Sequence, residues 1–384
     1  MKDANGKHRM CSRCILDTAD DPEIVFDERG VCNHCLLYDR VAKDRLLDAE
    51  QRERKLASIL EEIKAAGRKS GYDCVVGVSG GVDSSYVAYL AKEFGLRPLV
   101  VHCDNGWNSE LAVNNIENIV KRLGYDLYTY VIDWEEFKDL QLSYLKASVV
   151  DIEAVTDHAI VASLYKVAAG KGIKYILSGE NMATEGILPS HWVHNKNDLM
   201  NIKAIHRRFG SVRLKTFPTL GFMKKLYYQR AAGIRYVPIL DLIEYVKEDA
   251  KRMITEELGW RDYGGKHYES IFTRFYQSYI LPVKFGIDKR KSHLSTLVCS
   301  GQMTRQEALE RIKSEIINND VLVSDKVYVI KKFGLTLESF EAIMALPPRK
   351  HTEYRSILNV YRKLKPVTRL TTPGLRRRLV RLAG

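Results

Sequence analysis

Residues 73–84 read Asp-Cys-Val-Val-Gly-Val-Ser-Gly-Gly-Val-Asp-Ser. The first six residues predict a short buried strand, and residues 84–94 carry apolar side chains at helical spacing. A strand, a glycine turn and a helix that begins with Asp or Ser bind anions, because backbone N–H groups and the positive helix end point at the same place. Glycine at 80 and 81 permits close backbone approach. We therefore expect this turn to hold a phosphate group.

The turn Ser79-Gly80-Gly81-Val82-Asp83-Ser84 lacks the lysine of a Walker loop. It resembles the PP-loop of the ATP pyrophosphatases, Ser-Gly-Gly-x-Asp-Ser, at every fixed position. The resemblance implies an enzyme that cleaves ATP between the α and β phosphates and passes AMP to a carbonyl-type oxygen. A nitrogen or sulfur nucleophile then displaces the AMP. The alternative is an ordinary strand-to-helix turn that is rich in Gly and Ser.

Short apolar strands and helices alternate along the chain after this turn. The predicted segments are a strand over 98–103, a helix over 109–123, a strand over 127–132, a helix over 158–170 and a strand over 174–177. This alternation predicts an α/β fold with a doubly wound parallel sheet, here of the PP-loop ATPase (adenine nucleotide α-hydrolase-like) type. Ligands of such sheets bind beyond the carboxyl ends of the strands. Three polar clusters, 79–84, 102–107 and 178–181, fall at those ends.

The PP-loop resemblance assigns roles to residues at these strand ends. The expected ATP-binding residues are Val78, Ser79, Gly80, Gly81, Asp83, Ser84, Val101, His102, Asp104, Ser178 and Gly179. Asp83 is expected to organise Mg²⁺ or pyrophosphate, since divalent ions on ATP prefer hard oxygen ligands. Glu180 is expected to be catalytic, and Asp157, His158 and Asn181 are expected to contact the substrate. Three alternatives remain: a turn residue for Asp104, a solvent-facing turn for Glu180 and a helix cap for Asp157.

Four of the seven cysteines form two pairs, Cys11-x-x-Cys14 and Cys32-x-x-Cys35. Two such pairs supply the four thiolates of a tetrahedral structural zinc site. An iron–sulfur or redox use is the alternative, and disulfides are less expected in a reducing cytosol. Because a closed four-cysteine site has no open position for substrate, we expect Zn²⁺ to serve folding and docking here.

The 384 residues allow two or three domains. We predict a zinc-binding knuckle over 1–40, a linker helix over 41–66, a PP-loop ATP-binding domain over 67–215, a mainly helical acceptor region over 216–345 and a basic tail over 346–384. No apolar stretch approaches the length of a membrane span and the first residues lack a secretory signal, so we expect a cytoplasmic protein.

The net charge of +12 is concentrated at one end of the chain. Residues 349–384 hold eleven Lys and Arg against one acid, Glu353. Such a tail can be a solvated segment, or it can touch RNA, anionic lipid at a membrane surface or an acidic protein. The rest of the chain is close to neutral, which argues against a large nucleic-acid substrate.

The cysteine pairs, the PP-loop and a long second half together resemble the N-acetyl sugar amidotransferases of bacterial surface-polysaccharide (lipopolysaccharide O-antigen) biosynthesis. The segments that carry this resemblance lie within residues 8–320 and include 10–15, 32–35, 264–270, 285–295 and 300–305. The family reaction, as the resemblance implies, converts a sugar acetamido group into an acetamidino group. ATP adenylates the amide oxygen, and ammonia displaces AMP. Lys266 and Arg290 are the candidate catalytic cations for the leaving pyrophosphate, with ordinary surface charge as the alternative.

The predicted domains include no glutaminase, which bears on the source of ammonia, and few cysteines lie near the predicted active site, which bears on the rival function. It is too short to add a glutaminase module to the predicted domains, so the resemblance implies a separate glutaminase with a cyclase-like companion, both of imidazole-glycerol-phosphate-synthase type. The main rival is a tRNA-thiolating PP-loop enzyme, which needs cysteines near the active site. Only Cys103 is suitably placed for that role. A zinc-dependent scaffold that binds ATP without turnover is a third possibility.

Overall fold

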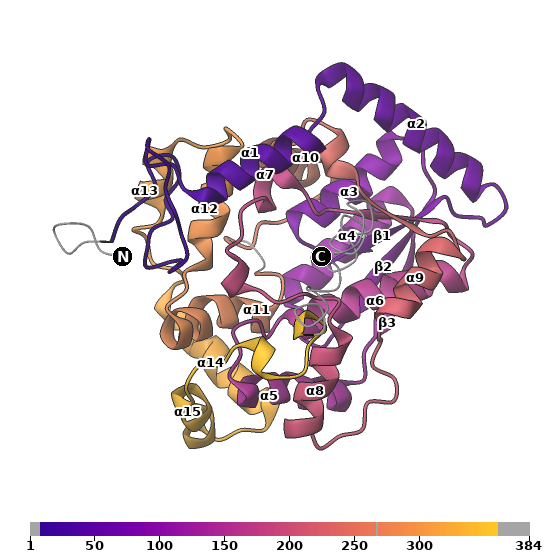
Figure 1. Ribbon diagram of the computed structural model, residues 1–384. Helices are drawn as coiled ribbons and strands as arrows, with labels where there is room; N and C mark the ends of the chain where they lie inside the picture. Colours follow the sequence, from indigo (N-terminus) through magenta and orange to yellow (C-terminus); the bar gives the residue numbers. More distant parts are fainter. Residues whose placement is uncertain (1–7, 266–267, 360–384) are drawn as a thin grey trace, which may run out of the picture.

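A sheet of parallel strands forms the centre of the molecule (Figure 1). The computed structural model describes residues 8–265 and 268–359. Within these residues the sheet has five strands in the order β3-β2-β1-β4-β5, and every neighbouring pair is parallel. The strands are β1 (Cys74–Val78), β2 (Pro98–Asp104), β3 (Asp126–Val131), β4 (Tyr175–Ser178) and β5 (Arg235–Pro238). The predicted doubly wound α/β fold class is confirmed.

The register of the sheet brings the predicted polar clusters together. Val78 at the end of β1 pairs with His102 near the end of β2, and Leu177 of β4 pairs with Val76 of β1. β1 and β4 are buried on both faces, which explains their continuous apolar sequences, whereas β3 is an exposed edge strand. The carboxyl ends of β1, β2 and β4 therefore meet at one edge of the sheet.

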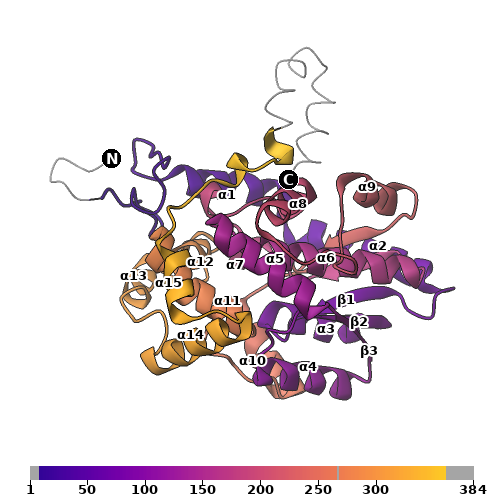
Figure 2. The same cartoon turned by 90° about the horizontal axis from the view of Figure 1, so that it is seen from below.

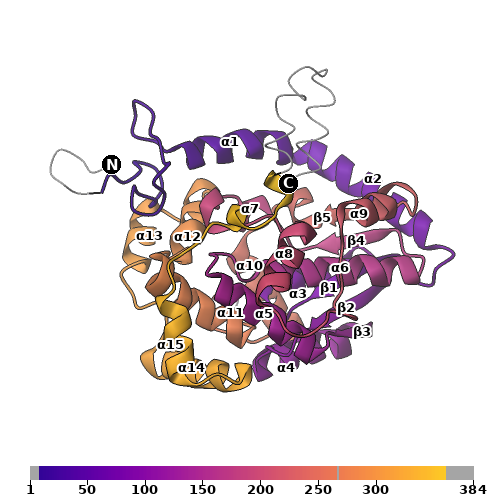
Figure 3. The ribbon, with the colours of Figure 1, turned by 60° about the horizontal axis from the view of Figure 1, so that its bottom comes forward.

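Helices cover both faces of the sheet (Figure 3). On one face, the packed core joins strand residues with α2 (Ala49–Gly67), α3 (Val82–Glu93), α4 (Glu110–Leu123) and α10 (Lys247–Leu258). On the other face, it joins strand residues with α6 (Ala154–Gly170) and α9 (Phe222–Arg230). α5 (Trp134–Ala147) packs against α8 (Leu199–Phe209) in a further core.

The sheet and its core extend beyond the predicted nucleotide domain of residues 67–215. β5 pairs with β4, and α10 packs on α3 and α4. Both lie in the segment predicted as the helical acceptor region, because a four-residue strand is too short to stand out from its neighbours in sequence. The boundary at residue 215 therefore cuts through one folded unit.

The N-terminal segment packs against helices from the far end of the chain (Figure 1). Ile15 lies in an apolar cluster with Leu294 and Leu297, and the Arg305 guanidinium donates to the backbone carbonyls of Cys11 and Cys14. The predicted linker helix over 41–66 is instead two helices, α1 (Asn33–Arg45) and α2. The break lies at Leu46–Asp48, where the Asp48 side chain caps α2 by accepting from the Gln51 N–H.

The second half of the described chain is mainly helical, as predicted, and lies beside the sheet (Figure 2). Its longer elements are α11 (Ile271–Phe275), the π-helix η3 (Tyr276–Phe285), α12 (Lys289–Cys299), α13 (Arg305–Arg311), α14 (Asn319–Phe333) and α15 (Leu337–Ala345). The short elements are α7 (Met182–Glu185), η1 (Ser190–Trp192), η2 (Ile239–Leu242) and η4 (His351–Glu353). None of the helices in these two ranges is long and apolar enough to cross a membrane.

The predicted basic tail over 346–384 is in part a packed segment. His351, Tyr354 and Ser356 are buried, and the Arg349 N–H donates to the Ser148 carbonyl. Residues 360–384, which hold most of the basic side chains, lie outside the described residues.

Candidate active site

A polar cavity with a volume of about 520 Å³ lies at the carboxyl ends of β1, β2 and β4. Its floor comes from the turn after β1 and from the ends of β2 and β4. Its opposite wall comes from α10, α11, α12 and the segment between α10 and α11. The first half of the chain and the last third therefore build one site, which is called the active cavity below.

The glycine turn is fixed in a shape that only glycine adopts easily. Gly80 has a φ of +85°, and a Cβ placed there would lie 2.8 Å from the Tyr263 hydroxyl oxygen and 3.0 Å from the Ala112 carbonyl oxygen. Trp260 Nε1 and the Tyr263 hydroxyl both donate to the Gly80 carbonyl, at 2.7 and 2.8 Å. Gly81 precedes α3 without any side-chain cap from the described residues. The first N–H groups of α3 are thus available to an anion.

Asp83 lies on the first turn of α3 and lines the active cavity, as predicted. The Tyr245 hydroxyl donates a hydrogen bond to Asp83 Oδ1. Burial of Tyr245, followed by the neighbouring Asp83 charge, raises the pKa of the tyrosine, so it remains a donor at neutral pH. A carboxylate beside the phosphate-binding turn fits the hard oxygen ligand that Mg²⁺ takes in nucleotide sites.

The end of β2 holds two predicted residues in the active cavity, Val101 and His102, and one outside its lining, Asp104. His102 lines the cavity; its Nδ1–H donates to the Val78 carbonyl and its Nε2 accepts from Asn108 Nδ2. Asp104, predicted to contact the nucleoside, does not line the cavity. Its Oδ1 accepts from the Gly106 N–H and from Asn108 Nδ2, which are the contacts that the alternative interpretation as a turn residue predicts.

At the end of β4, Ser178, Gly179 and Glu180 line the active cavity. A Cβ at Gly179 would lie 3.0 Å from the Asp83 backbone carbon, so glycine lets this strand end touch the helix that follows the PP-loop. The Tyr236 hydroxyl donates to Glu180 Oε1, and burial raises the pKa of Glu180. Asn181 is buried and is not part of the cavity lining. It caps α7 by accepting from the Thr184 N–H, so its side-chain oxygen is engaged within the fold.

Asp157 and His158, both predicted to contact the substrate, lie in different environments. Asp157 lines the active cavity and pairs with Lys196 at 3.0 Å. α6 begins at Ala154, so Asp157 is not its cap. His158 is buried outside the cavity lining: its Nδ1–H donates to the Lys196 carbonyl and its Nε2 accepts from the Leu220 N–H. Because both ring nitrogens are engaged, His158 positions the chain rather than contacting the substrate.

Of the two predicted cations, only Arg290 can be placed, and it does not line the active cavity. Lys266 lies outside the described residues. Arg290 pairs with Asp288 at 2.7 Å and donates to the carbonyls of Ser314 and Ile312, so it ties the start of α12 to the segment after α13. This correction has a simple geometric cause, since its neighbour Lys289 faces the cavity instead. Burial lowers the pKa of Lys289.

Sequence reasoning missed several residues of the active cavity. The cations Lys247, Lys251 and Arg311 join Lys289 in its lining. Glu153 lines it too: Oε2 accepts from the Thr273 hydroxyl at 2.8 Å, and Oε1 has no partner among the described residues. Burial raises the pKa of Glu153 to about 7. The helix predicted over 158–170 begins four residues earlier, which left Glu153 out of consideration.

The four N-terminal cysteines form a buried cluster far from these groups in sequence. Their sulfur atoms all lie within 4.8 Å of one another. Neighbouring sulfurs are 3.6 to 3.9 Å apart. A tetrahedron with Zn–S bonds of about 2.3 Å requires about 3.8 Å between sulfurs. The N–H groups of Arg13, Cys14 and Cys32 point at Cys11 Sγ, as hydrogen bonds to a thiolate do. The cluster therefore fits structural zinc.

A fifth thiol adjoins this cluster. Cys299 Sγ lies 3.5 Å from Cys35 Sγ at the end of α12, and Arg13 donates to the Cys299 carbonyl. The cysteine cluster thus docks on the helix whose first residue, Lys289, lines the active cavity. This contact was not predicted, because nearly three hundred residues separate the two segments.

Two family descriptions match the chain on the two sides of the active cavity. NAD synthase matches residues 53–135, which hold the PP-loop, β2 and β3. "LPS biosynthesis protein WbpG-like, C-terminal domain" matches residues 269–365. The chain is similar to WbpG-like and PP-loop proteins over these two segments. The first description covers the segment with the PP-loop, and the second is that of a domain from a lipopolysaccharide-biosynthesis protein.

Individual relatives match only parts of the chain. The glutamine-hydrolysing GMP synthase of Pyrobaculum aerophilum is 36% identical over 94 residues, which are 24% of this chain and 18% of that protein. The tRNA(Ile)-lysidine synthase of Thermus thermophilus is 29% identical over 110 residues, 28% of this chain and 20% of that one. The chain thus spans about a fifth of the length of these curated relatives.

Solved structures overlap with the chain more widely but less closely. NMN synthetase from Francisella tularensis is 17% identical, covers 76% of this chain and 98% of its own, and has a TM-score of 0.31. NH3-dependent NAD synthetase from Campylobacter jejuni is 17% identical, covers 55% and 84%, and has a TM-score of 0.29. TM-scores this low add no argument to the fold described above.

Proposed function

We propose that the protein is an ATP-dependent amidotransferase that converts the acetamido group of a sugar into an acetamidino group during lipopolysaccharide O-antigen biosynthesis. One observation carries this proposal. The active cavity has the PP-loop on one side and, on the other, residues from 269 to 311 that fall within the WbpG-like C-terminal domain. An ATP site and a surface-polysaccharide domain therefore face the same reaction space.

The chemistry explains why such a reaction needs ATP. An amide carbon is a weak electrophile and its oxygen a poor leaving group. The amide oxygen attacks the α-phosphorus of ATP, and pyrophosphate leaves. Ammonia then adds to the imidate carbon, and AMP departs with the former amide oxygen. The net change is acetamide plus ammonia plus ATP to acetamidine plus AMP plus pyrophosphate.

The first step places negative charge on the leaving pyrophosphate. The N–H groups at the start of α3 and the cations Lys247, Lys289 and Arg311 lie in the cavity where that charge forms. Asp83, fixed by Tyr245, would hold Mg²⁺, which neutralises phosphate charge when bound. Lys289 takes the role that the sequence assigned to Arg290.

The second step requires that protons leave the attacking nitrogen. Glu153 is the group in the active cavity whose pKa of about 7 suits a general base at neutral pH. Thr273 fixes one of its oxygens and leaves the other to accept a proton. We propose Glu153 as this base, with Glu180 and Asp157 on the same cavity wall as contacts for the acceptor.

The ammonia source is a separate part of the proposal. The family resemblance supports a partner glutaminase with a cyclase-like subunit of the imidazole-glycerol-phosphate-synthase type. Free ammonium salt should replace this partner in vitro at high concentration. Coexpression followed by purification of the complex, and glutamine-dependent turnover by that complex alone, would test the partner directly.

The rival function in tRNA thiolation has weak support from the cavity. Cys103 is the single thiol among the described lining residues, and burial raises its pKa to about 11. A thiol in that state is a poor sulfur carrier, because the thiolate is the reactive form.

The test measures pyrophosphate release from ATP and Mg²⁺ with ammonium salt and a panel of UDP-linked N-acetylated sugars, beside a bulk tRNA control. Sugar-dependent AMP and pyrophosphate, with a product about one mass unit lighter, is the expected result, since NH replaces O. Release stimulated by tRNA alone would move the assignment to RNA modification.

A further inference from the structure

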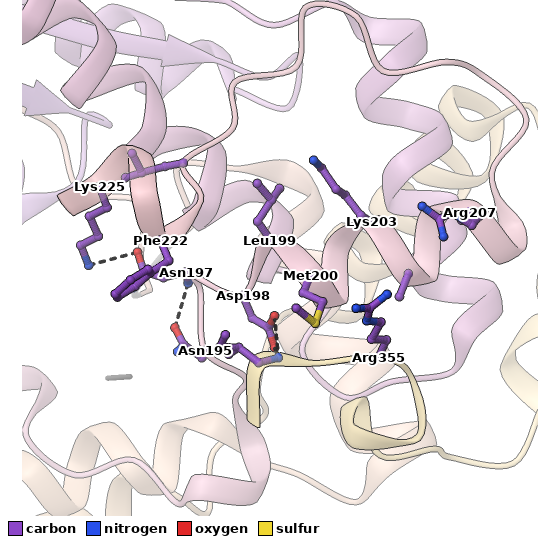
Figure 4. Close-up of a pocket in the computed structure, with 13 residues that line it drawn as sticks. Asn195, Asn197, Asp198, Leu199, Met200, Lys203, Arg207, Phe222, Lys225 and Arg355 are labelled. Atoms are coloured by element: carbon purple, nitrogen blue, oxygen red, sulfur yellow. Dashed lines mark hydrogen bonds between the residues drawn. The ribbon is translucent and has the colours of Figure 1, made fainter. Parts of the chain in front are cut away.

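A second cavity lies between the starts of α8 and α9 and the C-terminal segment around Arg355 (Figure 4). Its volume is about 390 Å³. It is called the basic cavity below, because four of the described residues that line it are cations: Lys203 and Arg207 from α8, Lys225 from α9, and Arg355.

Lys203, Arg207 and Arg355 are exposed. Some cations of the described chain are paired with an acid, whereas those of the basic cavity are not. Arg274, for example, forms two hydrogen bonds of 2.7 Å with Asp325. Neither Lys203, Arg207 nor Arg355 forms a salt bridge with any residue in the two described ranges. Lys225 Nζ donates only to the Asn197 side-chain oxygen, at 3.2 Å (Figure 4). Burial lowers the pKa of Lys225, and a bound anion would act against this shift by stabilising the charged form.

Asp198 is the one acid among the described residues of this lining, and its oxygens are already engaged. They accept hydrogen bonds from the Ser356 hydroxyl, from His194 Nε2 and from the N–H groups of Asn201 and Ile357. Asp198 therefore caps α8 and holds the C-terminal segment in place. No acid within residues 8–265 and 268–359 forms a direct ion pair with the cations of the basic cavity.

The remaining wall of the basic cavity is apolar, which indicates that its ligand also has an apolar part. Leu199, Met200, Phe222 and Ile357 supply apolar surface, and the Phe222 ring stands at the edge (Figure 4). α9 also begins at Phe222 without a side-chain cap or an acidic residue in its first turn. Cations beside apolar and aromatic surface suit an anion attached to a larger, partly apolar carrier.

The basic cavity adjoins the acceptor side of the active cavity through the first turn of α6. Asp157 lines the active cavity and pairs with Lys196, whose neighbours Asn195 and Asn197 line the basic cavity. The next residue, His158, hydrogen-bonds the backbone of Lys196 and of Leu220, and Leu220 also lines the basic cavity. Adjacent residues of one helix thus hold the walls of both cavities.

We propose that the basic cavity binds the diphosphate of the sugar acceptor, so that the acceptor is a sugar carried on a diphosphate linkage. That the bound diphosphate belongs to the sugar acceptor rests on the proposed function. That the basic cavity binds a diphosphate does not. Either a nucleoside diphosphate or a lipid diphosphate carries this group, and Arg and Lys bind it by the same charge-assisted hydrogen bonds.

The binding test uses full-length protein with saturating Mg²⁺ and a non-hydrolysable ATP analogue, which occupies the PP-loop. Uridine diphosphate and farnesyl diphosphate are titrated separately by calorimetry, so that the carrier is distinguished. The test variant is Lys203→Gln with Arg207→Gln, and the matched control is Lys224→Gln with Arg230→Gln, which removes the same charge from exposed positions of α9 outside the basic cavity. We expect at least one probe to bind, and its Kd to rise about tenfold in the test variant alone.

Three results would overturn the binding proposal: neither probe binds, the test variant binds equally well, or the control loses as much affinity. Kinetics then separate this proposal from the proposed function. A raised KM for the acceptor with an unchanged kcat in the test variant supports the acceptor role. Unchanged KM with retained turnover contradicts it while the proposed function stands. Diphosphate binding without any sugar-dependent turnover contradicts the proposed function and leaves the diphosphate site standing.

Discussion

The two sides of the active cavity differ in how they are built. The nucleotide side is a continuous stretch, Ser79 to Ser84, held between β1 and α3. The acceptor side is assembled from Glu153 on the edge of α6, Lys247 on α10 and Lys289 on α12. A local motif carries its own geometry, whereas an assembled wall depends on the packing of helices that are distant in sequence. Substitutions in the PP-loop, and of the cations that face it, should therefore act on adenylation, which releases pyrophosphate. Substitution of Glu153 should act on the later attack of ammonia, which releases AMP.

The largest effect is expected for Asp83→Ala. Loss of the carboxylate beside the PP-loop should lower ATP cleavage by about 10³-fold, because the phosphate charge loses its organising ligand. Tyr245→Phe, which keeps the carboxylate but removes its hydrogen bond, should cost about tenfold. Pyrophosphate release is measured beside zinc content and thermal unfolding. Normal release by Asp83→Ala would remove the PP-loop from the mechanism.

Gly80→Ala should weaken ATP binding by about 10²-fold or more. The new Cβ would meet the Tyr263 hydroxyl and the Ala112 carbonyl, and the φ of +85° disfavours any side chain. Gly71→Ala is the matched control, since its φ is +74° and nothing lies within 4 Å of the added Cβ. The control should lose about 1–2 kcal/mol of stability and keep its nucleotide affinity. Equal losses of affinity in both variants would mean that backbone strain alone explains the effect.

Glu153→Gln tests the acceptor side. With ATP and free ammonia held constant, the wild-type rate should fall as the pH drops below about 7, where Glu153 takes up a proton. The variant should be about 10²-fold slower and should lack this pH limb. A variant that keeps the same pH limb would exclude Glu153 as the base.

The same substitution gives a readout independent of turnover. The folded-state pKa of Glu153, about 7, lies above its ordinary value of 4.5, so the folded protein binds more protons between these values. The free energy of unfolding of the wild type should therefore fall as the pH rises from about 4.5 to 7, by about 3 kcal/mol at most. Denaturant titrations should show this decline in the wild type and its loss in Glu153→Gln.

The smallest effect on turnover is expected for substitutions of two neighbouring residues, Lys289 and Arg290. Lys289→Ala should lower kcat about tenfold with little change in stability, because the side chain faces the cavity. Arg290→Ala should instead lower stability and keep kcat, because Arg290 binds Asp288 and the carbonyls after α13. Steady-state kinetics and thermal unfolding of both variants decide the matter. The reverse pattern would restore Arg290 as the catalytic cation.

The sequence predicted most of the nucleotide side because its information is local. Gly80, Asp83 and Gly179 lie where the strand ends place them, and the four cysteines cluster as their spacing indicates. Asp104 lies outside the cavity lining, because a carboxylate before Asn-Gly accepts from the N–H of its own turn. The spacing of apolar residues in the sequence does not distinguish a strand-end residue that lines the cavity from one, such as Asp104, that does not.

The acceptor side was predicted poorly for a different reason. Asn181 and His158 have the right chemistry at the right place in the chain, but capping and backbone hydrogen bonds consume their polar atoms. The choice between Lys289 and Arg290 depends on the rotation of α12, which is set by its packing against α7 and the cysteine cluster. No pattern within α12 contains that information.

The most direct measurement follows the amide oxygen. An acceptor sugar labelled with ¹⁸O in its acetamido group is incubated with ATP, Mg²⁺ and ammonium salt, and the AMP formed is analysed by mass spectrometry. If the acetamido oxygen is adenylated, AMP gains one ¹⁸O and the sugar loses it. AMP that carries no label, or a sugar that keeps its oxygen while ATP is cleaved, would contradict the proposed function.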